Sequence, residues 1–182
     1  MKRTAIANHI DAFRTEAEML LRFQLAFKRI SKFEDMSQMS RSDFVDRLIA
    51  LKAIENDILI RVCKFDDGTK GVHSFPNSLN EIVDTHLNKD VIRKKIEQFS
   101  HLISKVKLER RHTQLAHLKI GVEDNDYDVR YDFTPAIKLI IEIIDLMNID
   151  KVNYKWSDGQ YEKFDLRHEI FGEMIEDKKN SC

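Results

Sequence analysis

The sequence AIKLIIEIIDLM, residues 136–147, is the most apolar stretch of this chain of 182 residues. Thr134 and Pro135 stand directly before it, a capping residue and then a proline in the first turn, which is a common way for a helix to begin. A helix that is apolar on nearly every side is normally buried. We therefore predict that this last core helix lies at the centre of a helical bundle or in a dimer interface.

A long basic helix is predicted over residues 89–110. Its apolar residues recur every three or four positions, which is typical of a helix with one face in a core: Ile92, Ile96, Phe99, Ile103 and Val106. The same spacing continues to Arg110, Thr113 and His117. Polar groups on a buried face need partners or a cavity. Either the helix breaks near Arg110, or these groups line a cleft or a subunit interface.

The stretch ERRHTQLAHLK, residues 109–119, holds two arginines and two histidines within residues 110–117. Arginine is a permanent cation whose fork of donors suits phosphate oxygens, and histidine exchanges protons near pH 7. Together they supply the charge stabilisation and proton transfer that phosphodiester chemistry needs. Both are also ordinary surface charges and helix C-caps, so the context of the stretch decides between a site and a solvated face.

Residues 111–117, RHTQLAH, resemble the signature of HEPN domains, in which an arginine is followed by about four to six residues and then a histidine. Here five residues separate Arg111 from His117, His112 takes the polar position after the arginine, and Ala116 precedes the second histidine. The chain is most similar to the HEPN group linked to bacterial abortive infection, over residues 40–148.

The resemblance implies an all-α, HEPN-like helical bundle that acts as a metal-independent endoribonuclease, a hydrolase of a toxin or phage-defence (antiviral) system. Arg111 would stabilise the phosphorane, and His117 would transfer protons. Because the reaction needs both an acid and a base, two copies of the motif would meet in a homodimer with a composite site. His112 is the alternative source of the second group within one chain. The partners would be an RNA substrate and a neutralising antitoxin, and we expect no metal ion or other cofactor.

In HEPN domains an earlier helix often carries polar or acidic residues that face the motif. Here the candidate is residues 53–62, AIENDILIRV, in a helix predicted over residues 42–64. Glu55 falls on the apolar stripe of that helix, and Asp57 follows two residues later. We predict that Glu55 or Asp57 holds the motif arginine, and the alternative is a structural ion pair or a solvent-facing Asp57. Arg110 and Gln114 complete the supporting residues.

Two departures from the family pattern favour a rival hypothesis. Lys119 stands where one toxin branch has a tyrosine, and Leu118 and Lys119 occupy positions that are often polar or acidic in the family. The rival is a non-catalytic HEPN module that binds RNA, a nucleotide or a protein partner.

The rest of the chain predicts helices over residues 4–31 and from Asn77 or Ser78 to residue 86, with Ser40 or Ser42 as the cap of the second helix. We divide the chain into a HEPN-like helical domain, residues 1–149, and a C-terminal extension, residues 150–182, that packs on the body. Its sequence predicts a hairpin or a tight turn in residues 154–164 and a final helix over residues 164–176. Its aromatic residues are suited to packing or to stacking on bases.

The charge and cysteine content indicate the cellular compartment and the class of partner. The net charge is −1, but residues 89–119 hold nine Lys or Arg against three Asp or Glu, a basic segment in an acidic body. Cys63 and Cys182 are too few for a disulfide framework or a zinc site. No apolar run is long enough to cross a membrane. These features predict a soluble, cytoplasmic protein without membrane contact.

Overall fold

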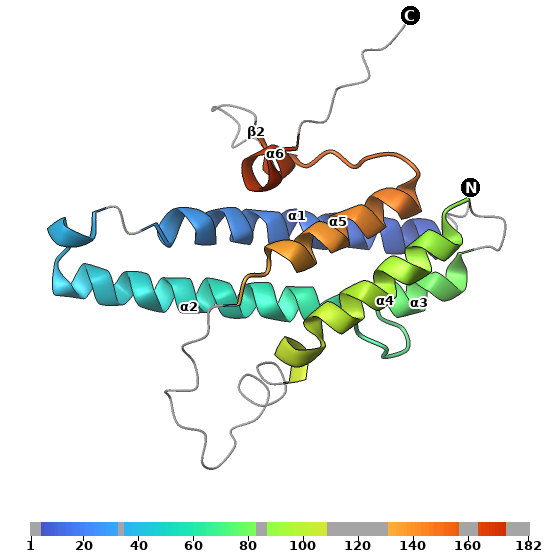
Figure 1. Cartoon of the computed structure of the whole chain (residues 1–182), viewed down its shortest axis with the longest axis horizontal. Helices are drawn as coiled ribbons and strands as arrows, with labels where there is room; N and C mark the ends of the chain where they lie inside the picture. The colour runs from blue at the N-terminus through green and yellow to red at the C-terminus, as the bar shows by residue number, and fades with distance from the viewer. Residues whose placement is uncertain (1–4, 33–34, 83–86, 109–130, 157–163, 174–182) are drawn as a thin grey trace, which may run out of the picture.

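The computed structural model describes residues 5–32, 35–82, 87–108, 131–156 and 164–173 (Figure 1). The helices are α1 (Ala5–Ile30), η1 (Met36–Gln38), α2 (Arg41–Lys64), α3 (Phe75–Glu81), α4 (Lys89–Val106), α5 (Thr134–Asn148) and α6 (Leu166–Phe171). The strands β1 (Lys155–Trp156) and β2 (Phe164–Asp165) pair antiparallel. Apart from this two-residue ladder, the described elements are helical, so the all-α prediction is confirmed.

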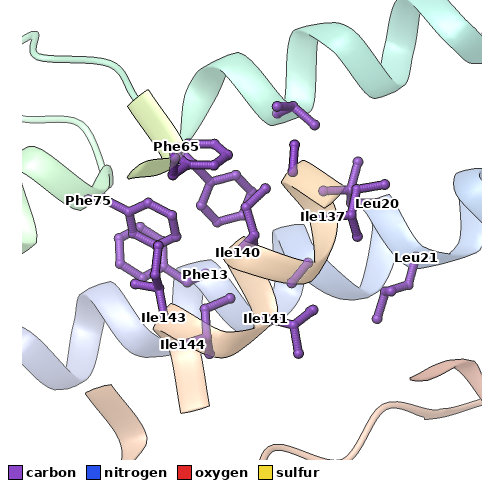
Figure 2. Packing of buried hydrophobic residues seen from close by; sticks show 14 of the residues in the cluster. Phe13, Leu20, Leu21, Phe65, Phe75, Ile137, Ile140, Ile141, Ile143 and Ile144 are labelled. Carbon is purple, nitrogen blue, oxygen red and sulfur yellow. The ribbon is translucent and has the colours of Figure 1, made fainter. Parts of the chain in front are cut away.

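Helix α5 is the centre of the bundle. Seven of its residues are buried: Ala136, Ile137, Ile140, Ile141, Ile143, Ile144 and Met147. It packs against α1 and α4, and Figure 2 shows its isoleucines in one cluster with phenylalanines from other helices. Of the two positions predicted for this helix, a bundle centre or a dimer interface, the structure has the bundle centre.

A cluster of phenylalanines joins the remaining helices to this core. Phe75, at the start of α3, lies 5.1 Å from Phe13 of α1, 5.0 Å from Phe65 and 5.6 Å from Phe99 of α4, measured between ring centroids. All four side chains are at most 2% exposed. The ring contacts fix the start of α3 against three other parts of the fold.

Helix α3 begins earlier than predicted. Its N-cap is Ser74, whose Oγ accepts from the backbone N–H of Asn77, and Pro76 stands in the first turn. The prediction of Asn77 or Ser78 as the cap was wrong, because proline in the first turn favours a start just before it. For α2, the cap is Ser40, which accepts from the N–H of Asp43 at 3.1 Å.

The first half of α2 is more exposed than its apolar spacing predicts. Leu48 continues the three-four spacing of Leu51, Glu55 and Ile58 but is 38% exposed, and Val45 and Ile49 are 45% and 62% exposed. The cause is the arrangement of the helices, since the start of α2 lies beside the end of α1 and extends past α5 (Figure 1). The second half of α2 is buried at Ile58, Leu59 and Val62 as expected.

The C-terminal extension lies against α1 and α5 in its described part. The Lys28 ammonium on α1 donates to the carbonyl of Ile170 at 2.8 Å, and α6 packs on α1. Helix α6 is shorter than the predicted 164–176, because Gly172 at φ +70° ends it in the left-handed conformation. Tyr154 is 3% exposed, so it packs in the core. The division at residue 150 stays a prediction.

No helix in the described part of the chain is both long and apolar enough to cross a bilayer.

Candidate functional site

The predicted catalytic residues Arg111, His112 and His117, and the supporting Arg110 and Gln114, lie in residues 109–130, outside the described residues. The site is therefore characterised by the elements on either side of this segment and by the two carboxylates predicted on α2.

The residue at which the described chain resumes is held against α4 by its side chain. Helix α4 ends at Val106, and the described chain resumes at Tyr131, whose hydroxyl donates to the carbonyl of Leu102 at 3.1 Å. The Tyr131 ring packs on Phe133, which is 3% exposed, at 4.8 Å between centroids. Burial and the nearby Asp132 raise the pKa of Tyr131, so its hydroxyl stays protonated and able to donate at neutral pH. The chain thus returns from residue 130 beside the last turns of α4.

A pocket of about 210 Å³ opens at this return point, between α1, α2 and residues 131–134. Its walls carry both apolar and polar side chains: Gln24, Phe27, Lys28, Ser31, Glu55, Ile58, Tyr131, Asp132, Phe133 and Thr134. Gln24 is 4% exposed and its amide donates to the Thr134 hydroxyl at 3.2 Å, which links α1 to the start of α5 across the pocket. The pocket is therefore lined by hydrogen-bonded polar side chains as well as by apolar ones.

Glu55 projects from α2 into the wall of this pocket. It is 8% exposed and shares the buried face of α2 with Leu51 and Ile58, as the sequence spacing predicts. A carboxylate at this depth needs a cation or hydrogen-bond donors. Its predicted pairing with Arg110 or Arg111 falls on residues outside the described part and stays a prediction.

Asp57 lies in an ion-pair network with neighbouring side chains. Its carboxylate accepts from Arg61 Nε, and Arg61 Nη1 donates to Glu16 Oε1 of α1 at 2.9 Å. Lys64 Nζ reaches the same Glu16 oxygen at 3.2 Å. This is the structural ion pair that the sequence left open as an alternative for Asp57. Of the two carboxylates, Glu55 is the one that lines the pocket.

Most Lys and Arg side chains in residues 89–107 form ion pairs or hydrogen bonds with other residues of the chain. Lys95 pairs with Glu142 at 2.6 Å, Lys107 with Asp66 at 2.7 Å, and Arg93 with Asp90 at 3.2 Å. Lys89 Nζ donates to the carbonyl of Ile82 at 2.8 Å. Lys94 and Lys105 remain on the exposed face of α4. Within residues 89–107, four of the six Lys and Arg side chains therefore have partners inside the fold.

The polar pocket residues on α1 and at the start of α5 were missed as site candidates. The signal for Gln24 was present, because a glutamine interrupts the apolar stripe of the first helix. Lys28 and Thr134 carry no comparable signal, since either residue is ordinary at a helix end.

The comparisons with known proteins give no match: no family model, no curated protein and no solved structure is similar to this chain. Within the described residues, no group of three His, Cys, Asp or Glu side chains is placed to hold a metal ion.

Proposed function

We propose that the chain is a metal-independent endoribonuclease of the HEPN type that acts as a toxin or phage-defence RNase. The observation that supports it most is the position of Glu55, a buried carboxylate in the wall of a pocket that also includes Tyr131, 14 residues after His117 in the sequence. A buried acid is what a motif arginine would need for its orientation.

In the proposed reaction, one histidine takes the proton from a ribose 2′-hydroxyl, and the resulting oxygen attacks the adjacent phosphate. Arg111 stabilises the charge that gathers on the phosphorane oxygens, since its fork binds two of them at once. A second histidine protonates the 5′-oxygen as the phosphorus–oxygen bond breaks. Glu55 holds the arginine, and His117 supplies one of the two proton-transfer groups.

The second histidine comes from another copy of the chain. The apolar side chains of α5 are buried within its own chain, so a dimer needs another apolar surface. Exposed apolar residues of α2 supply one. Val45, Ile49 and Ile60 are 45%, 62% and 42% exposed and lie on the face of α2 opposite Ile58. Glu55 lies on the buried face of the same helix, away from these exposed residues.

Two residues of opposite charge stand at equal distances on either side of Ile49 in the sequence. Asp46 and Lys52 are both exposed and stand three residues before and after it. Antiparallel packing of two α2 helices about a two-fold axis at Ile49 sets Asp46 against Lys52 of the partner subunit, and this pair occurs twice. We therefore propose α2 as the dimer interface.

Incubation of the purified protein with total RNA in excess EDTA tests the reaction class. Cleavage under these conditions supports the nuclease. RNA or nucleotide binding without cleavage, in a protein whose expression leaves growth unchanged, would replace it with the non-catalytic module.

A further inference from the structure

Two histidines that are distant in sequence meet at the opposite end of the bundle from Glu55. His9 lies near the start of α1, and His73 lies in the loop between α2 and α3. Their Nδ1 atoms are 3.2 Å apart, and their rings meet edge to face with centroids 4.7 Å apart. The pair does not take part in the proposed cleavage.

The separation of the two nitrogens fits a shared metal ion. Zinc binds imidazole nitrogen at about 2.0–2.1 Å, and the tetrahedral angle then places two ligand nitrogens about 3.3 Å apart. A hydrogen bond between one Nδ1–H and the other bare Nδ1 gives the same separation when no metal is bound. A metal ion would replace that proton once the donor ring shifts its hydrogen to Nε2.

We propose that His9 and His73 form a two-histidine chelating site for a divalent transition-metal ion of the zinc class, with water completing the coordination. The spacing of 64 residues between these histidines hides the site from sequence inspection. Because only these two ligands are assigned, the site is open and of moderate affinity.

The charges around the pair suit a cation. The carboxylate of Glu81 interacts electrostatically with His9. The negative charge of Glu81 also favours a bound cation. Lys64, which lines the adjoining cavity with His73, is paired with Glu16 at 3.2 Å.

Both backbones are held in place before any metal arrives. The Asn77 amide donates to the carbonyls of Thr69 and Val72 at 2.7 and 3.0 Å, and the N–H of Phe75 donates to Phe65 at 2.8 Å. His9 is carried on α1 and its ring lies 5.8 Å from that of Phe13. Preorganised ligands bind with less loss of entropy. A bound ion would therefore clamp the start of α1 to the loop before α3.

The test is calorimetric titration of ZnCl₂ into protein that was stripped with EDTA and dialysed. We compare wild type, His9→Ala, His73→Ala and the matched control His101→Ala, which removes an exposed histidine of α4. Loss of groups that merely orient ligands weakens metal binding about 10–100-fold, so loss of a ligand should weaken it at least about tenfold. Zinc should also raise the melting temperature of wild type and of His101→Ala, but not of the other two variants.

Circular dichroism verifies that each variant remains helical. Equal zinc affinity in all four proteins, or no binding by wild type at millimolar zinc, would overturn the site. The proposal is independent of the nuclease, since EDTA should lower thermal stability without stopping RNA cleavage.

Discussion

Arg167 Nη1 donates a hydrogen bond to Asp145 Oδ2 over 2.7 Å, and their side chains are only 3% and 14% exposed. The other oxygen of Asp145 accepts from the N–H of Val152 at 2.7 Å, and Arg167 Nη2 donates to Glu173 at 2.9 Å. The pair thus joins α6 and the chain after α5 to the central helix. The C-terminal extension is fixed to the body by this buried network as well as by apolar packing.

Arg167→Ala should strongly destabilise the protein, because it leaves the Asp145 carboxylate buried without its cation. Breaking a buried pair in this way costs about 3–5 kcal/mol of unfolding free energy, which urea denaturation measures. Arg29→Ala is the control. It removes a pair with Glu169 at 3.8 Å whose side chains are 59% and 37% exposed, and such surface pairs contribute about 0–1 kcal/mol. Equal losses in the two variants would contradict a structural role for the buried network.

Acid should weaken the same network at Glu173. The hydrogen bond from Arg167, followed by the charges of Arg167 and Lys138, holds the pKa of Glu173 below its ordinary value of 4.5, against the opposing effect of burial. A carboxyl whose pKa is lower in the folded state stabilises the fold above its unfolded pKa, and this contribution is lost as the pH falls through the folded value. Urea unfolding between pH 6 and pH 3 should show a smaller loss of stability in Glu173→Gln than in wild type. A loss of the same size in both proteins would remove Glu173 as a contributor.

The sequence predicted those parts of the fold that depend on periodicity within one element. The burial of Ile92, Ile96 and Ile103 on α4, and of Glu55 on α2, follows from helical spacing alone. Leu48 has the same spacing but is exposed, because its burial depends on how far the neighbouring helices extend. Spacing within one helix carries no such information.

Contacts between distant side chains were not predictable. Arg167 with Asp145, Tyr131 with Leu102 and His9 with His73 each depend on how two elements dock. Asp57 illustrates the limit for the site. Its position on α2 was consistent with holding a motif arginine, but Arg61, one turn later on the same helix, pairs with it.

The proposed α2 interface predicts a specific effect on assembly. Wild type should be a dimer by light scattering at micromolar concentration, and Ile49→Glu should be a monomer, because it places two carboxylates at the two-fold axis. Val91→Glu, which changes an apolar residue on α4 that is 48% exposed, is the matched control and should stay dimeric. Asp46→Lys alone should weaken the dimer, and Asp46→Lys with Lys52→Asp should restore it. A monomeric wild type would exclude the composite site.

Glu55 and Asp57, the two carboxylates predicted to face the motif, should differ in their effect on RNA cleavage. Glu55→Gln should slow RNA cleavage, because it weakens the hold on the motif arginine, whereas Asp57→Asn should leave cleavage near wild type and lower stability through Arg61. Cleavage rates and urea unfolding of both variants separate these roles. The reverse order of effects would assign the arginine to Asp57.

The motif arginine itself is identified by three substitutions. Arg111→Ala should abolish RNA cleavage, and Arg111→Lys should not restore cleavage fully, because a point charge does not replace the two-pronged guanidinium. Arg110→Ala is the control between the two registers and should lose less activity than Arg111→Ala. Loss of activity in Arg110→Ala with activity kept in Arg111→Ala would move the motif by one residue and leave the mechanism intact.

The most direct test of the proposed nuclease compares the rates of RNA cleavage by wild type and by His117→Ala in EDTA. The RNA affinity of both proteins is measured alongside. Removal of a general acid–base group should slow cleavage by about 10²–10⁴ while RNA binding and helical content stay near wild type, since this group acts mainly in the transition state. Cleavage by His117→Ala at the wild-type rate, or no cleavage by wild type, would contradict the proposed nuclease.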